Sequence, residues 1–396
     1  MGVPRWGIGI IDAFPVLPMI SRLLVLALAA FLTTLSLPVP AEVPAPPPVA
    51  ARAWLLMDTA SGQLLASQGE HERAEPASLT KLMTAYLSFS ALKAKTLQLA
   101  QPVPVSERAW RAEGSRMFIE PRRPVTVEEL IHGMIVQSGN DACIALAEAI
   151  AGSEEVFAQM MNREAQRLGM KDTSFVNSTG LSEPKHYSSA HDLALLATAV
   201  IRDFPEYYRY YSIREYRYNN IAQPNRNRLL WLDPNVDGVK TGYTENAGYC
   251  LIASAKRGQR RLLSVVLGTA SENVRAQESQ KLLNYGFQFY DSARLYEKGQ
   301  TVSTVQVWKG SARVLKAGVA ADLSVSVPKG TTDKLKADLV SQQPLLAPIS
   351  AGQRVGTIRV MLESKQIGEY PVVALENIAV AGIIGRTWDT VRLWFR

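Results

Sequence analysis

Three short segments of the sequence carry side chains that together could perform nucleophilic catalysis. The first, SLTK, holds Ser78 and Lys81 three residues apart at the start of a helical pattern, which places both side chains on one side of the helix. A serine hydroxyl attacks well only when a base removes its proton, and lysine acts as that base only where burial or nearby cations lower its pKa. Alone, this spacing is equally that of an ordinary helix N-terminus, with Ser78 as the cap and Lys81 in solvent.

The other two segments carry groups suited to a leaving amine and a carboxylate. QSGND places Ser138 and Asn140 between two helical patterns, where the serine could pass on a proton and the asparagine could hold an amide carbonyl. VKTGYT places Lys240 beside Thr241 in a strand pattern, and a cation with a hydroxyl suits a carboxylate. Gly242 would leave room for a ligand backbone along the strand. The structural alternatives are a helix-capping turn and an ordinary strand.

The elements that must position these segments follow the order strands, helices, strands. Such an order favours an α+β domain whose sheet is assembled from both chain ends, with helices on its faces. Thr126 and Glu129 predict a capping box at one helix start, and Gly169 predicts a helix end. Strand patterns cover residues 53–58, 63–67, 236–244 and 248–268. Helical patterns cover residues 76–93, 126–137, 141–153, 154–170, 188–204 and 274–290.

The sequence changes in character after Gly299. Short alternating runs broken by Gly, Pro or Asn predict a small all-β domain over residues 303–380. Residues 381–396 have helical spacing, and their apolar face is formed by Ile384, Trp388, Val391 and Phe395, with Trp394 at its edge. This amphipathic segment is too short to span a bilayer and is suited to lie at a membrane surface; the alternative is a terminal helix that docks on its own domain.

The N-terminal residues 1–41 have the organisation of a secretory signal. Arg22 precedes an apolar run over residues 23–37, and a small-residue ending predicts cleavage after Ala41, with Met19 as a possible true start. The run is short for a membrane span, although an uncleaved anchor is the alternative. Residues 42–52 are rich in proline and predict an extended linker.

Composition limits the classes of partner and cofactor that we expect for this protein. The net charge of +7 is compatible with nucleic acid, an anionic membrane or an acidic polymer. We find no run of basic and aromatic residues that would favour nucleic acid, so we do not expect a nucleic-acid partner. Cys143 and Cys250 are too few for a disulfide scaffold and are expected to pack in the interior. The four histidines are not spaced as metal ligands, and we expect no metal or other cofactor.

In the order S-x-x-K, S-x-N, K-T-G, the three segments resemble the penicillin-binding proteins and serine β-lactamases. The similarity is closer to the low-molecular-mass penicillin-binding proteins, the D-alanyl-D-alanine carboxypeptidases, and covers nearly the whole mature chain. It includes EPASLTKLMTAY, QSGNDACIALAE, YSSAHDLALLA and NVDGVKTGYTENAGYCLIAS. The resemblance implies a β-lactamase/transpeptidase-like domain over residues 53–302. It also implies a peptidoglycan pentapeptide substrate, β-lactam inhibitors and a periplasmic location on the inner membrane.

The resemblance also assigns roles by position. Ser78 would be the acylated nucleophile and Lys81 its base. Ser138 would pass a proton to the leaving D-alanine, with Asn140 and Lys240 assisting.

The remaining assignments concern the oxyanion and the terminal carboxylate. The backbone N–H groups of Ser78 and Tyr243 would form the oxyanion hole. Thr241 and Arg226 would bind the carboxylate, and Arg275 would either add to the positive field or form a surface ion pair. Many relatives have histidine where this chain has Tyr243, which predicts a different pH dependence and a different tolerance of substrate side chains.

Three other functions fit parts of the same pattern. A D-alanyl-D-alanine endopeptidase shares all three motifs. A class A β-lactamase would need a glutamate-bearing loop to activate water, for which Glu183 is the candidate, and usually has S-D-N where this chain has SGN. A non-catalytic wall-binding protein could keep the fold without the activity.

Overall fold

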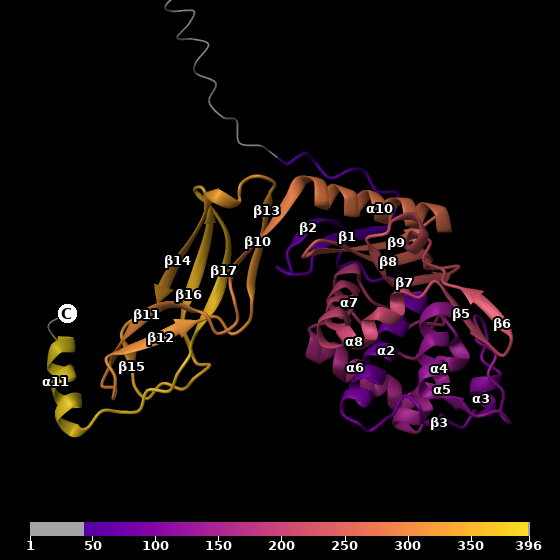
Figure 1. Ribbon diagram of the computed structural model, residues 1–396, viewed down its shortest axis with the longest axis horizontal. Helices are drawn as coiled ribbons and strands as arrows, with labels where there is room; N and C mark the ends of the chain where they lie inside the picture. The colour runs from indigo at the N-terminus through magenta and orange to yellow at the C-terminus, as the bar shows by residue number, and fades with distance from the viewer. Residues whose placement is uncertain (1–42, 395–396) are drawn as a thin grey trace, which may run out of the picture. The chain divides into compact units, whose positions relative to one another are not determined.

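The computed structural model describes residues 43–394 of the chain (Figure 1). The predicted signal, its cleavage site and Met19 lie outside the described residues. Of the linker, residues 43–50 have no regular secondary structure. Cys143 and Cys250 are both buried free thiols, as expected.

The first domain is built on an antiparallel sheet that joins both ends of its sequence. The strand order is β2-β1-β9-β8-β7, and β1 pairs with β9 along its whole length. The sequence-based expectation of a sheet from both chain ends is therefore confirmed. The strands are β1 (Ala53–Asp58), β2 (Leu64–Gln68), β7 (Val236–Thr244), β8 (Gly248–Arg257) and β9 (Arg260–Thr269).

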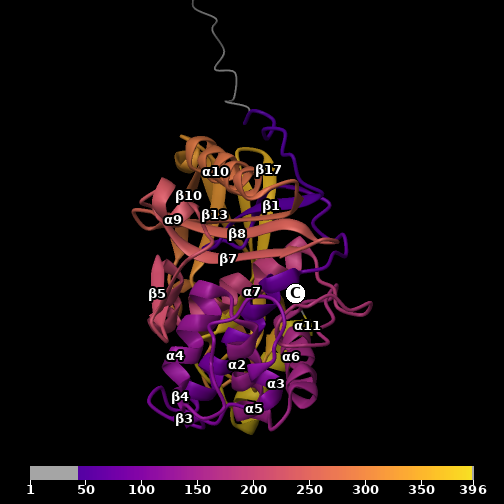
Figure 2. The same ribbon diagram turned by 90° about the vertical axis from the view of Figure 1, so that its right-hand side faces the viewer.

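Helices cover both faces of this sheet. α10 (Glu272–Phe289) packs on β8 and β9, whereas α7 (Ala190–Asp203) packs on the other face against β1 and β9, as Figures 1 and 2 show. The other helical elements up to residue 151 are η1 (Ala77–Thr80), α2 (Lys81–Lys93), α3 (Glu107–Trp110), α4 (Val127–His132), the π-helical turn η2 (Gly133–Gln137) and α5 (Asn140–Ala151). Those that follow are α6 (Glu154–Leu168), α8 (Pro205–Tyr208), η3 (Arg209–Ser212) and α9 (Leu229–Leu232). Two short strand pairs complete the domain, namely β3 (Pro102–Val103) with β4 (Val125–Thr126) and β5 (Glu215–Tyr218) with β6 (Ile221–Pro224).

The predicted helix ends have clear local causes. Thr126 and Glu129 form the expected capping box at the start of α4, with both hydrogen bonds present. Gly169 ends α6 in the left-handed conformation, with φ of 81°, which glycine adopts without steric cost. These local signals are confirmed.

The second domain consists of β strands with their own hydrophobic core. Its main sheet has the order β14-β16-β17-β12-β11-β15, and β10 pairs separately with β13. Because β10 directly follows α10 and pairs within this domain, we place the domain start near residue 290, earlier than the expected 303. The elements are β10 (Tyr290–Tyr296), β11 (Thr301–Trp308), β12 (Val314–Gly318), β13 (Leu323–Pro328), η4 (Thr332–Lys334), β14 (Leu335–Ser341), β15 (Leu345–Leu346), β16 (Arg354–Leu362) and β17 (Lys365–Ala374).

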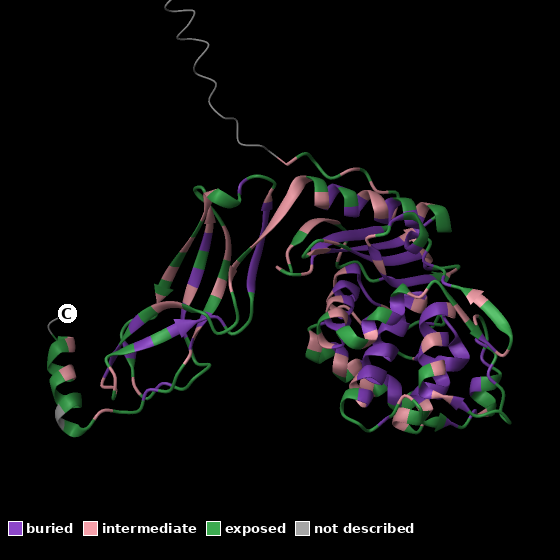
Figure 3. Cartoon of the chain, viewed as in Figure 1, coloured by how far each residue is buried: buried purple, intermediate pink, exposed green. Residues whose placement is uncertain are grey.

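The final helix, α11 (Ile383–Trp394), is largely exposed (Figure 3). Trp388 is 60% exposed and Trp394 is 88% exposed. The polar residues contact the β domain instead, since Asp389 accepts a hydrogen bond from the backbone N–H of Lys309 at 2.7 Å. None of the helices in the described residues has the length and apolar character needed to cross a bilayer.

Candidate active site

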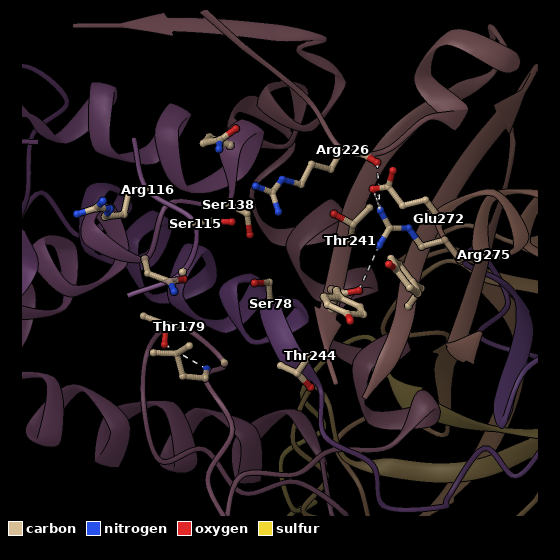
Figure 4. A pocket seen from close by; sticks show the side chains of 18 of the residues that line it. Ser78, Ser115, Arg116, Ser138, Thr179, Arg226, Thr241, Thr244, Glu272 and Arg275 are labelled. Atoms are coloured by element: carbon tan, nitrogen blue, oxygen red, sulfur yellow. Dashed lines mark hydrogen bonds and ion pairs between the residues drawn. The ribbon is translucent and has the colours of Figure 1, made fainter. Parts of the chain in front are cut away.

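A cleft of about 590 Å³ lies where η1, the connection into α5 and β7 meet (Figure 4). Lys81 and Lys240 lie beneath it and contact the lining residues Ser78 and Ser138. The structure therefore brings all the sequence-predicted site residues together. The other predicted residues that line the cleft are Asn140, Arg226, Thr241, Gly242, Tyr243 and Arg275.

Ser78 lies inside the 3₁₀ turn η1, one turn before α2 begins at Lys81. Its side chain caps neither helix, so the expectation of a helix-capping serine is wrong. The preceding residue, Ala77, has a φ of 47°, a left-handed conformation that costs an alanine about 1–2 kcal/mol. The turn leaves the Ser78 hydroxyl free to face the cleft.

Lys81 is 1% exposed and has three partners at its amine. Its Nζ lies 3.1 Å from Ser78 Oγ, 2.6 Å from Asn140 Oδ1 and 2.6 Å from the backbone oxygen of Thr179. Burial is the main cause that lowers the pKa of Lys81, and the positive charge of Arg226 lowers it further. The lowered pKa favours the neutral amine, whose lone pair a base requires.

Ser138 and Lys240 form a second hydroxyl–amine pair across the cleft. Lys240 Nζ donates to Ser138 Oγ at 3.0 Å and to the backbone oxygen of Thr241 at 3.0 Å. Burial, followed by the charges of Lys81 and Arg226, lowers the pKa of Lys240 well below its usual range. Ser138 has a φ of 67°, so its hydroxyl is presented from a strained turn.

Asn140 links Lys81 to the segment before α4. While its Oδ1 accepts from Lys81, its Nδ2 donates to the backbone oxygen of Glu113 at 2.6 Å. These opposite roles fix the orientation of the amide. Asn140 thus positions the amine of Lys81, and its side-chain amide is not available to bind substrate.

The end of the cleft beyond β7 carries two arginines with different environments. Arg226 is exposed and lines the cleft. Arg275 is 3% exposed, pairs with Glu272 at 2.7 Å and donates to the backbone oxygen of Gly242 at 3.3 Å. Arg275 is therefore not in a surface ion pair, and it supports β7 from below.

Gly242 acts differently from the sequence-based expectation, and the neighbouring Tyr243 packs on a second tyrosine. A Cβ on Gly242 would lie 3.1 Å from the backbone oxygen of Pro76 and 3.2 Å from the Cβ of Ala77. The missing side chain therefore lets β7 approach the serine turn, whereas the sequence suggested room for a ligand backbone. Tyr243 is 51% exposed, and its ring packs against Tyr249 with centroids 4.3 Å apart.

Sequence reasoning missed the loop between α6 and α7. Thr179 supplies the carbonyl that Lys81 contacts, and a Cβ on Gly180 would collide with the backbone of Ala77. The dipeptide Thr179-Gly180 was the only signal, since a glycine in a turn can mark a close backbone approach. The residue type does not reveal which backbone carbonyl will accept a hydrogen bond.

Sequence reasoning also missed one buried acid and one buried base. The carboxylate of Asp141 accepts hydrogen bonds from the backbone N–H groups of Met117, Phe118 and Ile119. His186 holds Thr80 next to the turn that carries Ser78, with Nε2 2.8 Å from Thr80 Oγ1.

Glu183 is exposed and does not line the cleft, so it is not placed to activate water. Within residues 43–394, we find no cluster of His, Cys, Asp or Glu that could hold a metal ion.

Comparisons with known proteins agree with this geometry. Residues 41–271 match the family model described as D-alanyl-D-alanine carboxypeptidase, and residues 290–380 match the penicillin-binding protein 5, C-terminal domain. D-alanyl-D-alanine carboxypeptidase DacC from Escherichia coli is 45% identical over 357 residues, covering 88% of this chain and 89% of its own.

Solved structures show the same similarity. Penicillin-binding protein 5 from Haemophilus influenzae is 38% identical with a TM-score of 0.82, over 85% of this chain and 99% of its own. Penicillin-binding protein D2 from Listeria monocytogenes, in an ampicillin-bound form, is 30% identical with a TM-score of 0.57, over 62% of this chain and all of its own. The chain therefore belongs to the D-alanyl-D-alanine carboxypeptidase family, the low-molecular-mass penicillin-binding proteins with a penicillin-binding protein 5 C-terminal domain.

Proposed function

We propose that this serine D-alanyl-D-alanine carboxypeptidase removes the terminal D-alanine from peptidoglycan pentapeptide stems through an acyl-enzyme on Ser78. The observation that carries the proposal is the set of contacts at Lys81. A neutral amine has two N–H donors and one lone pair. Asn140 Oδ1 and the Thr179 carbonyl can only accept, which leaves the lone pair for the Ser78 hydroxyl.

Acylation then follows from the two hydroxyl–amine pairs. Lys81 takes the proton of Ser78 as its Oγ attacks the penultimate D-alanine carbonyl, and the backbone N–H groups of Ser78 and Tyr243 bind the oxyanion. When the amide C–N bond breaks, Ser138 gives its proton to the leaving amine and takes up the proton that Lys81 received from Ser78, while Lys240, 3.0 Å away, holds the Ser138 hydroxyl in place. Water subsequently hydrolyses the ester and frees Ser78.

The residues available to bind a terminal carboxylate support a carboxypeptidase reaction. Arg226 is an exposed cation on the cleft lining, and Thr241 offers a hydroxyl beside it. A carboxylate bound by a cation and a hydroxyl is held by charge-assisted hydrogen bonds. Arg275 contributes indirectly, by donating to the backbone of Gly242 and of Arg226.

The same nucleophile should react with β-lactams, as expected for a relative of the ampicillin-bound Listeria protein. A β-lactamase role is disfavoured because Glu183 lies outside the cleft lining and Glu272, on the lining, is paired with Arg275. An endopeptidase role is disfavoured by the C-terminal domain match over residues 290–380.

We propose a location outside the cytoplasm, at the surface of the inner membrane. The predicted signal supports export. In α11 the exposed Trp388, Val391 and Trp394 are free to enter a membrane interface, while Asp389 is held by Lys309. The helix would then lie in the plane of the interface.

Fluorescent penicillin tests the acyl-enzyme. The wild-type protein should become labelled and Ser78→Ala should not; equal labelling of the two would overturn the proposal, and failure of the wild type to label would favour a non-catalytic protein. Mass spectrometry of digested wall fragments tests the reaction type. Release of free D-alanine from pentapeptides is expected, whereas loss of cross-linked dimers without it would show an endopeptidase.

A further inference from the structure

The wall of the cleft opposite β7 is a rigid loop, residues 113–119. The carboxylate of Asp141, fully buried, accepts from the backbone N–H of Met117 at 2.9 Å and of Phe118 at 2.8 Å. Phe118 has a φ of 69°, which a residue with a side chain adopts only when its surroundings impose it. The loop is thus held in one conformation from below.

The other end of the loop is fixed as well. The backbone N–H of Asn140 donates to the oxygen of Ser115 at 2.6 Å. The Gln223 side chain donates to the backbone oxygen of Arg116 at 3.3 Å. A loop anchored at several points presents its side chains with little loss of entropy on binding.

Arg116 is the cation that this loop presents. It is half-buried, lines the cleft and stacks over Phe118 with its Cζ 5.3 Å from the ring centroid. Stacking of this kind leaves the edge N–H donors of a guanidinium available for a bidentate carboxylate. Among residues 43–394, no carboxylate forms an ion pair with Arg116, in contrast to Arg275, which is paired with Glu272.

The position of Arg116 assigns it to a different part of the substrate from Arg226. In Figure 4, Arg116 lies on one side of Ser78 and Ser138, and Arg226 and Arg275 lie on the other. If the leaving D-alanine extends toward Arg226, the acylating part of the peptide extends toward Arg116. A cleft of about 590 Å³ is in the range that holds a drug-sized ligand, so it has room for more than two alanines.

We infer that Arg116 binds a carboxylate on the acyl-donor part of the peptide stem, upstream of D-Ala-D-Ala. This inference rests on the proposed carboxypeptidase function. It makes Arg116 a residue that selects among stems, because a stem without that carboxylate gains nothing from the guanidinium. A half-exposed pair of this type is worth at most about fivefold in binding.

The test uses three N-acetylated peptides that end in D-Ala-D-Ala. One carries a carboxylate on the side chain of the residue directly before D-Ala-D-Ala, the second carries it one residue further upstream, and the third has amides at both places. D-Alanine release is measured as kcat and KM for the wild type, Arg116→Gln and Arg122→Gln. Arg122 is an exposed arginine three residues beyond this loop that does not line the cleft, and it controls for general charge.

The expected result is an approximately fivefold wild-type preference for one carboxylate peptide, seen mainly in KM. Arg116→Gln should remove this preference and Arg122→Gln should keep it; which peptide is preferred identifies the carboxylate. No wild-type preference, or its equal loss in both variants, would overturn the inference. Labelling by fluorescent penicillin separates the two proposals, since a labelled protein without preference keeps the proposed function, whereas no label and no D-alanine release refute that function.

Discussion

Protonation of His186 should destabilise the catalytic domain in mild acid. The Nδ1 atom of His186 accepts from the backbone N–H of Val176 at 3.1 Å, so the proton of the neutral ring lies on Nε2 and is donated to Thr80 Oγ1 at 2.8 Å. His186 is 2% exposed, and burial lowers its pKa from 6.5 to about 4. Because Thr80 adjoins Lys81, a charge here would disturb the turn that carries the base.

The sign and size of the effect follow from this pKa difference. Between pH 6.5 and pH 4, the unfolded chain binds a proton on this histidine that the folded protein does not bind. The contribution of His186 is therefore complete above pH 6.5 and is lost as the pH falls toward 4. At 1.36 kcal/mol for each pKa unit, the full loss is about 3 kcal/mol, of which about 2 kcal/mol is lost by pH 5.

Urea denaturation at pH 7.5 and pH 5.0 measures this loss. His186→Gln is the matched variant, because glutamine offers one donor and one acceptor but does not titrate. From pH 7.5 to pH 5.0, the free energy of unfolding should fall by about 2 kcal/mol more in the wild type than in the variant. Other titrating groups, such as His132, are present in both proteins and cancel in the difference. Equal losses in the two proteins would refute the reasoning.

Three further predictions concern the base, the loop and the terminal helix. Because burial lowers the pKa of Lys81, the rate of penicillin acylation should rise with an apparent pKa below that of a free lysine. Lys81→Arg, which stays protonated, should lower the rate about 100-fold or more at pH 7.5 while circular dichroism remains native. Gly180→Ala forces a collision with the Ala77 backbone and should lower the rate of acylation at least about tenfold. The control is Gly258→Ala, at a positive φ with nothing within 4 Å, which should only lower the free energy of unfolding in urea by about 1 kcal/mol. An equal effect of the two substitutions on acylation would contradict the role of the loop that carries Gly180. Truncation before Gly385 should release the protein from anionic lipid vesicles in a flotation assay, and unchanged binding would show that α11 is not the anchor.

The sequence allowed the two hydroxyl–amine pairs to be predicted because they are made by side chains, which the sequence shows directly. Ser78 and Lys81 are separated by one helical turn, so local geometry alone brings them within 3.1 Å. The pairing of Ser138 with Lys240 was predicted only through the family resemblance, since 102 residues separate them. The sheet was predictable for another reason: strand patterns at both ends of the domain have to pair with each other to be buried.

The supporting contacts were not predictable because they depend on backbone groups and on burial. The carbonyl of Thr179 and the N–H groups that Asp141 binds are backbone groups. Nearly every residue carries such groups, so the sequence does not single them out. Arg275 has the appearance of a surface residue in the sequence, yet it is buried under β7. Likewise, the cap expected at Ser78 failed because η1 adds a 3₁₀ turn before α2, and the sequence pattern does not separate these two helix types.

The hydrogen bonds of the base explain why a chance S-x-x-K would not act as a catalyst. Lys81 is held by Asn140 and by Thr179, which lie 59 and 98 residues away in the sequence. Both contacts also keep the amine out of water, and it is burial that lowers its pKa. Nucleophile activation is therefore a property of three packed segments and not of the motif, so a substitution that loosens any one contact should lower acylation before it unfolds the domain.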